Sequence, residues 1–411
     1  MNYQETLNYI HSLGYFSKPA GLHRIKAVMS KLGNPQNRFG SIHIAGTNGK
    51  GSVSAMLSSV FKTAGFKTGL FISPYIVDFR ERIQINGEYI SKEDLAFYAQ
   101  RVIDTGIELT EFEFITAAAF LYFADKNIDI LICETGLGGR LDATNVLDKL
   151  YAAVITKIGL DHTAILGDTY EKIAKEKCGI LRDAPTVTSP YQKNEALNVI
   201  KSAAQKLFIP DIKKLEIIGS DIAGSTFIYK GEAFEIGLCG EYQIENALIA
   251  IETVKNCGMG IPHQTLYEGL KNASFPARLE VFSKSPLVVL DGAHNQDGAE
   301  SLAKELSRYS GRVTAVIGMM KDKDVNEVLR ITLKHCKAAV AVDVPEMARS
   351  MDSVELQKTA SKYCPCQTAA TLREAVSTAV ELSSGEPVFV FGSLYLASAI
   401  RPILYEQFKK F

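Results

Sequence analysis

The chain has almost no net charge and no long uncharged hydrophobic run. Its 45 basic and 46 acidic residues leave a formal net charge of -1, so no electrostatic field favours nucleic acid or an anionic membrane over a small substrate. No uncharged run approaches the roughly 20 residues that a membrane-spanning helix needs, and the amino terminus lacks the basic and apolar regions of a secretory signal. We therefore expect a cytoplasmic protein with no nucleic-acid or membrane partner.

Cysteine is scarce and shows no metal-site pattern. The seven cysteines are odd in number and lack the paired spacing of a zinc site, although Cys364 and Cys366 lie close together in the chain. The pattern argues against a disulfide framework or a structural zinc. It predicts reduced thiols that lie mostly in the core.

Length and composition favour two globular domains. The 411 residues exceed the length, roughly 250 to 300 residues, at which a single core stops growing. A content of 46% hydrophobic and 22% charged residues suits a protein with a sizeable core. The proline and small residues of segment 272–280 mark a linker, so we place the first domain at 1–275 and the second at 276–411.

Short apolar runs alternate with helical patterns, which predicts an α/β fold with parallel sheets covered by helices on both faces. The expected strands are 42–45, 68–72, 130–134 and 152–158 in the first domain, and 287–290, 313–317, 338–342 and 387–391 in the second. Between residues 215 and 239, short segments joined at Lys230-Gly231-Glu232 predict a small antiparallel β appendage. In such folds functional residues gather at the carboxyl ends of strands.

The most informative motif is a glycine-rich turn between the strand 42–45 and a helical pattern, Gly46-Thr47-Asn48-Gly49-Lys50-Gly51-Ser52. Backbone N–H groups of such a turn hold phosphate oxygens, the lysine neutralises them, and the hydroxyl can ligate Mg²⁺. The glycines permit left-handed or crowded backbone. Strict Walker spacing would require glycine at Ile44, so the match is to a shorter variant. An ordinary glycine turn is the alternative, but the order of strand, turn, lysine, hydroxyl and helix favours ATP binding.

Acids and histidines follow several of the expected strands. Glu134 ends a buried strand and suits Mg²⁺ binding, Asp161 and His162 follow the next strand, and Asp291 and His294 follow a strand of the second domain. A histidine with an ordinary pKa near 6.5 can act as a neutral ligand or as an acid or base. The two acid and histidine pairs predict a cleft between the domains.

Each of these residues also has a structural interpretation. A strand-end acid such as Glu134 can be a solvated loop charge, and a lone histidine more often supports the fold than binds a ligand. Ser73-Pro74 can be a simple turn, and Lys177 can lie on a solvated helix end. Arg278, in the linker, could bind phosphate through a bidentate contact.

Taken together, these segments resemble the folylpolyglutamate synthase and dihydrofolate synthase family, a branch of the Mur ligase superfamily. The match covers nearly the whole chain. Its motifs are 46–52, 73–74, 81–87, 110–113, 134–145, 161–163, 166–167, 173–179, 278–280, 291–295, 321–324 and 392–395.

The resemblance implies a P-loop ATPase domain of the Mur ligase type followed by a smaller Rossmann-like domain that binds glutamate. It also implies ATP-dependent joining of L-glutamate to dihydropteroate or a folate: the substrate carboxylate becomes an acyl phosphate, which the amine of glutamate then attacks. The cofactors implied are ATP and two Mg²⁺ ions, and this family is often monomeric.

The resemblance also assigns roles to individual residues. It places Ser52, Glu134 and His162 at the first Mg²⁺ and Ser73 at the second, makes Lys177 a carbamylated lysine, and gives Lys50 a catalytic role. The positions implied for the nucleotide are Asn246, Arg278, Asp291 and His294, of which the last two are also expected to be catalytic. The positions implied for the pterin or folate substrate are Leu22, Arg82, Thr110, Phe112, Asp142 and Ala143.

The chain departs from the family pattern at three places: Tyr75 replaces a histidine, Ala277 a glycine and Gln296 a proline. Tyr75 lies beside a proposed magnesium residue, which puts the second cation and the folate loop in doubt. Two other functions are considered, a ligase acting on UDP-muramyl peptides and a nucleotide-binding switch without catalysis. The short segment before Gly46 argues against the former, and the combination of Lys177, His162 and Asp291 against the latter. The sequence leaves open whether one or both synthase activities are present.

Overall fold

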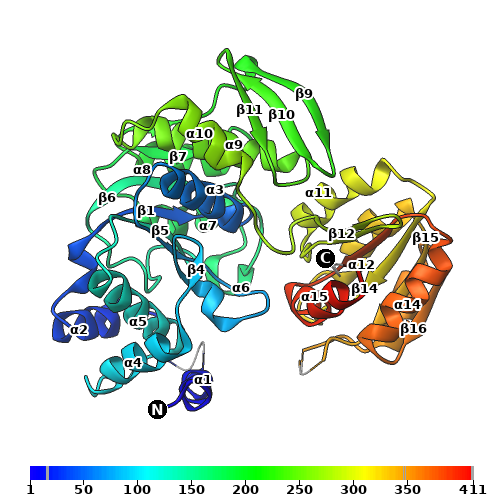
Figure 1. Ribbon diagram of the computed structural model, residues 1–411, viewed down its shortest axis with the longest axis horizontal. Coiled ribbons are helices and arrows are strands. Elements are labelled where there is room, and N and C mark those ends of the chain that lie inside the picture. Colours follow the sequence, from blue (N-terminus) through cyan, green and yellow to red (C-terminus); the bar gives the residue numbers. More distant parts are fainter. Residues whose placement is uncertain (15–17, 346, 348, 409–411) are drawn as a thin grey trace. The chain divides into compact units, whose positions relative to one another are not determined.

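The computed structural model describes residues 1–14, 18–345, 347 and 349–408, and the chain forms two compact units (Figure 1). The first unit comprises Met1–Ile218, Thr226–Gly237 and Gln243–Ser274, and the second comprises Gly219–Ser225, Leu238–Tyr242 and Phe275–Phe411. No helix among the described residues is long and apolar enough to span a membrane.

The first unit is built on an eight-stranded sheet whose strand order is β4-β3-β2-β5-β1-β6-β7-β8. The central strand β1 (Gly40–Ala45) runs parallel to both β5 (Ile130–Glu134) and β6 (Leu150–Ile155). The other strands are β2 (Thr68–Phe71), β3 (Ile83–Ile85), β4 (Glu88–Tyr89), β7 (Thr186–Thr188) and β8 (Leu207–Phe208). The predicted parallel sheet is confirmed, with an antiparallel edge at β3 and β4 that the sequence patterns did not predict.

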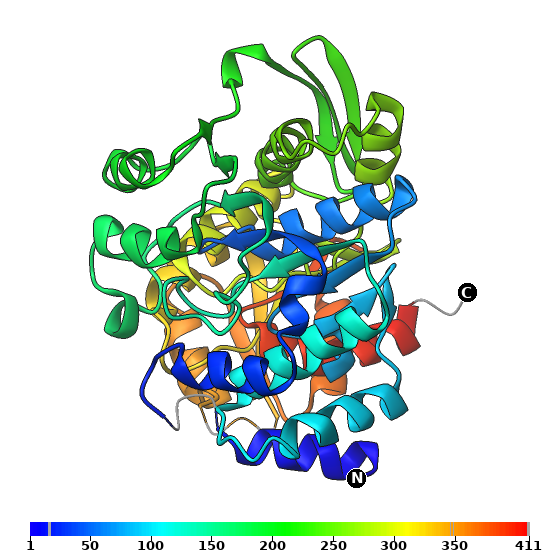
Figure 2. The same cartoon turned by 90° about the vertical axis from the view of Figure 1, so that its left-hand side faces the viewer.

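Helices cover both faces of this sheet. Figures 1 and 2 show α3 (Lys50–Thr63), α9 (Tyr242–Asn256) and α10 (His263–Lys271) on one face, and α2 (His23–Lys31), α4 (Lys92–Ile103) and α5 (Glu111–Asp125) on the other. Helix α5 is buried along almost its whole length because it is apolar on all sides. The remaining helices are α1 (Tyr3–Ser12), α6 (Thr163–Leu166), α7 (Tyr170–Lys177) and α8 (Asn194–Ala203), with 3₁₀ turns at Pro35–Arg38, Phe79–Arg82, Cys178–Ile180 and Ile212–Lys214.

The predicted β appendage is a separate three-stranded antiparallel sheet in the order β11-β10-β9. Its strands are β9 (Leu215–Asp221), β10 (Gly224–Tyr229) and β11 (Glu232–Ile236). Lys230 and Gly231 both have positive φ, 52° and 82°, which matches the tight hairpin turn predicted there.

The second unit contains a six-stranded sheet in the order β12-β13-β17-β14-β15-β16. Its strands are β12 (Glu280–Lys284), β13 (Leu287–Leu290), β14 (Val313–Ile317), β15 (Cys336–Val342), β16 (Cys366–Ala369) and β17 (Val388–Phe391). Its helices are α11 (Gln296–Ser307), α12 (Val325–Thr332), α13 (Ser353–Ala360), α14 (Leu372–Ser383) and α15 (Leu394–Phe408), with a 3₁₀ turn at Leu333–His335. Only the edge strand β12 pairs antiparallel among those described. All seven cysteines are free, and six are buried.

Candidate active site

The glycine-rich turn connects β1 to α3, and two of its glycines are required by its shape. Gly46 has a φ of 157°, and a Cβ added there would lie 1.8 Å from the Thr156 hydroxyl oxygen. Gly49 has a φ of 90°, and its added Cβ would lie 2.3 Å from Oδ1 of Asn246. Gly51 lies in the first turn of α3 and does not have positive φ. The structure therefore brings Asn246 against the turn although the two are about 200 residues apart in the sequence.

The segment after β6 supports the turn. The backbone N–H groups of Thr47 and Asn48 donate to the Lys157 carbonyl at 3.0 and 3.2 Å, and the Thr47 hydroxyl donates to the Gly159 carbonyl at 3.1 Å. The strand predicted at 152–158 accordingly ends at Ile155, because these carbonyls bind the turn instead of a neighbouring strand. Gln192, which sequence reasoning missed, accepts a hydrogen bond from the Ile158 N–H at 3.0 Å and holds this segment in place.

Lys50, Glu134 and Ser73 meet beside the turn. The Lys50 ammonium lies 3.8 Å from Oε1 of Glu134 and donates to the Thr47 carbonyl at 3.3 Å. The Ser73 N–H donates to Oε2 of Glu134 at 3.3 Å. Ser52 is buried in the first turn of α3. Carboxylate and hydroxyl oxygens are hard ligands, so this donor set fits Mg²⁺, which binds through one or two protein groups together with phosphates and water.

Lys177, at the end of α7, lies inside the protein rather than on a solvated face. It is only 4% exposed, and its ammonium donates to the Gly46 carbonyl at 2.7 Å. Burial, reinforced by the positive charge of Lys50, lowers the Lys177 pKa from 10.5 to about 7, against weaker opposing effects of Asp161 and Asp142. A lysine that is partly neutral near physiological pH is therefore in direct contact with the phosphate turn.

His162 lies in a different environment from Glu134. It precedes the short helix α6 with a φ of 51°, is exposed, and its backbone N–H donates to Asp161 at 2.8 Å. Within the described parts of the chain, no three histidine, cysteine, aspartate or glutamate side chains gather into a metal cluster. The metal role of His162 stays a prediction.

A buried polar chain supports the glycine loop that follows Glu134. Asp142 accepts the backbone N–H groups of Leu137 and Thr144 at 2.8 and 3.0 Å, and the Thr144 hydroxyl donates to it at 2.5 Å. Nε2 of His43, in β1, lies 2.8 Å from that hydroxyl. Because the Thr144 hydroxyl donates to Asp142, its oxygen accepts a hydrogen bond from His43, so Nε2 of His43 carries a proton. Burial lowers the His43 pKa to about 3, which agrees with a neutral ring.

Sequence reasoning placed Asp142 at the pterin but missed His43 and Thr144. A histidine within an apolar strand was the one available signal. Burial raises the pKa of Asp142, against the hydrogen bonds that lower it. The hydrogen bonds that Asp142 accepts from Leu137 and Thr144 support the loop from within. The neighbouring Ala143 is buried.

Phe112, in the first turn of α5, borders the same loop. A Cβ added to Gly136 would lie 2.6 Å from Cζ of Phe112, so the loop packs directly against the tip of this ring. Thr110 caps the start of α5, and Leu22 occupies the corresponding position before α2. Arg82 is 2% exposed and lies over two aromatic rings, 5.0 Å from the Tyr75 centroid and 5.5 Å from that of Phe79. Tyr75, which replaces the family's histidine, therefore packs against Arg82.

The second unit holds Arg278, Asp291 and His294 close together in the chain. Asp291 is buried and accepts the Leu279 and Ala293 N–H groups at 2.9 and 2.8 Å. Burial raises its pKa, and the neighbouring Arg278 opposes that increase. Nδ1 of His294 lies 2.8 Å from the Gly292 carbonyl, so Nδ1 carries the proton.

The departure at Ala277 has a local explanation. Ala277 has a φ of 53°, in the left-handed region that favours glycine. Its backbone N–H donates to Glu280 at 3.1 Å, and its carbonyl accepts the Gly292 N–H at 3.0 Å. These bonds hold an alanine in a conformation that suits the glycine expected there.

Family models and named relatives match this chain over most of its length. The Mur ligase middle domain model matches residues 44–254, and the Mur ligase glutamate ligase domain model matches 277–394. The chain is 35% identical to the dihydrofolate synthase/folylpolyglutamate synthase of Bacillus subtilis, covering 97% of this chain and 98% of that protein. It is 34% identical to the folylpolyglutamate synthase of Lacticaseibacillus casei, covering 98% and 99%.

Solved structures of this family have the same fold as this chain. Folylpolyglutamate synthase of Mycobacterium tuberculosis, complexed with ADP and AMPPCP, superposes with a TM-score of 0.89 at 29% identity, covering 98% of this chain and 99% of that one. FolC of Escherichia coli, in complex with DHPP and ADP, also gives a TM-score of 0.89, at 27% identity and coverages of 99% and 98%. The chain belongs to the folylpolyglutamate synthase and dihydrofolate synthase family of Mur ligases, which are ATP-dependent glutamate ligases.

Proposed function

We propose that this protein joins L-glutamate to dihydropteroate, to a folate, or to both, through an acyl phosphate made from ATP. The observation that carries the proposal is the meeting of Lys50, Glu134 and Lys177 at one glycine turn. The names of the relatives, and the ADP and DHPP bound in the FolC structure, support the same substrates. The protein is expected to act as a monomer.

The chemistry requires two displacements at one place. The substrate carboxylate attacks the γ-phosphorus of ATP, the bond to the bridging oxygen breaks, and ADP leaves. The glutamate nitrogen then attacks the acyl carbon and loses a proton, and phosphate departs. Backbone N–H groups of the turn 46–52 other than those of Thr47 and Asn48, which donate to the Lys157 carbonyl, would hold the phosphates, and Lys50 would balance their charge. Most of the acceleration would then come from alignment and electrostatic stabilisation.

Ser52 and Glu134 would hold one Mg²⁺, with His162 beside it, and Ser73 would serve a second. When bound, these cations neutralise phosphate charge. The Ser73 N–H and the Lys50 ammonium fix the orientation of the Glu134 carboxylate before any cation arrives.

Lys177 is proposed to become a carbamate. Its neutral amine attacks carbon dioxide, the new N–C bond forms, and one proton is released, which converts a cation into an anion. A pKa of about 7 makes the neutral amine abundant near neutral pH, and this environment supports the proposal.

The remaining roles follow from the resemblance. Asn246, Arg278, Asp291 and His294 would contact the nucleotide, and residues 276–411 would bind glutamate. Phe112 would offer its aromatic face to the heterocycle. The other substrate residues in this proposal are Leu22, Arg82, Thr110, Asp142 and Ala143.

A phosphate-release assay tests the function. The purified protein with Mg-ATP should release phosphate only when glutamate and a pteroate substrate are both present, with the product identified by mass spectrometry. Dihydropteroate, tetrahydrofolate and a UDP-muramyl peptide are compared as acid substrates. Turnover with the muramyl peptide alone would replace the proposed substrate, and phosphate release without either substrate would indicate an uncoupled ATPase.

A further inference from the structure

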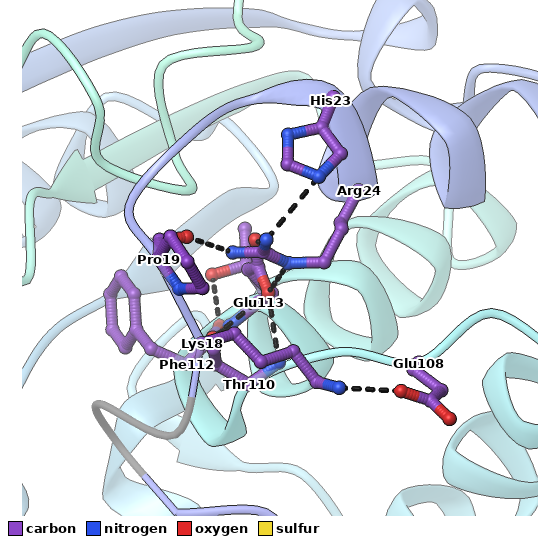
Figure 3. A network of polar contacts seen from close by, with 9 residues as sticks. Lys18, Pro19, His23, Arg24, Glu108, Thr110, Phe112 and Glu113 are labelled. Atoms are coloured by element: carbon purple, nitrogen blue, oxygen red, sulfur yellow. Dashed lines mark hydrogen bonds and ion pairs between the residues drawn. The ribbon is translucent and has the colours of Figure 1, made fainter.

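Two chain segments meet beside the glycine loop at a buried ion pair. Arg24, in α2, donates through Nε to both carboxylate oxygens of Glu113, in α5, at 3.1 and 3.0 Å. The two side chains are 13% and 6% exposed. Figure 3 shows this pair at the centre of a network that joins the start of α2 to the start of α5.

Glu113 also caps the start of α5. It belongs to the capping box of α5, accepting the Thr110 N–H at 2.8 Å and the Thr110 hydroxyl at 3.0 Å. One carboxylate therefore fixes both the first turn of α5 and the guanidinium of Arg24.

Arg24 in turn fixes the segment that leads into α2. Its Nη2 donates to the Pro19 carbonyl at 2.8 Å, while its Nη1 lies 3.3 Å from Nε2 of His23. Lys18, in the same segment, pairs with Glu108 at 2.6 Å. The planar fork of arginine permits simultaneous bonds to Glu113 and to Pro19, which the single ammonium of lysine does not reproduce.

The network borders the reaction centre. Phe112, next to Glu113, packs on Gly136, and Gly136 follows two residues after Glu134, which faces Lys50. The segment 18–22 and the start of α5 are thus joined on the side of Phe112 that carries the proposed substrate residues Leu22 and Thr110.

We propose that Arg24 and Glu113 are positioning residues for the pteroate-type substrate, which hold segment 18–22 against the start of α5. The inference rests on the proposed function. It assigns these residues to the affinity for the acid substrate and not to phosphoryl transfer, because neither contacts the glycine turn in any recorded bond.

The test is a set of variants measured against dihydropteroate, ATP and glutamate. Glu113→Gln keeps a capping side chain but removes the charge, and Arg24→Lys keeps the charge but removes the fork. Both should raise KM for dihydropteroate by about tenfold, with kcat and KM for ATP changed by less than about twofold. The matched control is Asp125→Asn, which breaks the exposed pair with Arg101 at the far end of α5 and should leave every constant unchanged.

A double variant, Arg24→Met with Glu113→Gln, adds a sharper criterion. If one ion pair carries the effect, the double variant should bind dihydropteroate no more weakly than Arg24→Met alone. The proposal would be overturned if the effects of the two substitutions on KM for dihydropteroate multiplied in the double variant, or if Glu113→Gln and Asp125→Asn had the same KM. An equally large rise in KM for ATP would also overturn it. Thermal unfolding shows whether each variant is folded. If Glu113→Gln does not fold, Arg24→Lys tests the proposal by itself. A wild-type protein that turns over no pteroate substrate would overturn the proposed function, and this inference with it.

Discussion

Replacing Lys177 with methionine should stabilise the protein while abolishing its activity. The lysine is nearly completely buried, and its only bond recorded in the described structure is to the Gly46 carbonyl. Methionine fills a similar volume without a charge to desolvate. Active-site groups with shifted pKa values commonly reduce stability in this way.

The magnitude follows from the lowered pKa. Between about 7 and 10.5 the unfolded chain binds a proton that the folded protein does not, so the free energy of unfolding of the wild type rises with pH across this window. One proton contributes about 1.4 kcal/mol per pH unit, which gives about 5 kcal/mol over the whole window. Losing the hydrogen bond to Gly46 offsets about 1 kcal/mol, so the variant should be about 3 to 4 kcal/mol more stable near neutral pH and no more stable at the alkaline end.

The measurement is calorimetric unfolding in carbon-dioxide-free buffers from neutral to alkaline pH, where the gain near neutrality should appear as a rise of several degrees in Tm. Lys172→Met is the matched control, since Lys172 is an exposed residue of the same helix paired with Asp168 and should not change the pH slope. A Lys177→Met protein whose stability follows the wild-type pH slope would refute the reasoning.

Three further changes test other parts of the site. Lys50→Ala should abolish phosphate release while leaving the fold intact by circular dichroism, because it removes the cation facing Glu134; wild-type kinetics would contradict that role. Thr144→Val removes the hydroxyl that links His43 to Asp142 and should raise KM for dihydropteroate by about tenfold, whereas Thr144→Ser should keep the wild-type KM. Equal KM values in the two variants would contradict a role for this hydroxyl. Ala277→Gly should raise stability by up to about 1 kcal/mol, seen as a higher Tm of the second unit, and a lower Tm would argue against strain at its positive φ.

The fold class and the main strands could be predicted because buried parallel strands are short apolar runs that end in glycine or polar residues. Strands such as β5 and β13 have the predicted bounds. Strands β3, β4 and β12 could not be predicted, since edge strands are short and partly polar and their pairing depends on residues distant in the sequence.

That the glycine turn and Glu134 lie together could be predicted, because both follow parallel strands of one sheet. The site was not predictable where a residue acts through distant partners. The role of His43, a polar residue in an apolar strand, depends on its contact with Thr144, which lies about 100 residues away in the sequence. Gln192 has a role only because the segment after β6 bends toward the turn. The roles assigned from the resemblance stay predictions until substrates are bound or mutants are measured.

The central claim, that the substrate carboxylate is phosphorylated at this turn, is tested most directly by isotope transfer. Dihydropteroate labelled with oxygen-18 in its carboxylate is incubated with the protein, Mg-ATP and glutamate, and the released phosphate is analysed by mass spectrometry. The account predicts one labelled oxygen in each phosphate, because the attacking carboxylate oxygen leaves with the phosphoryl group. Amide product accompanied by unlabelled phosphate would contradict it.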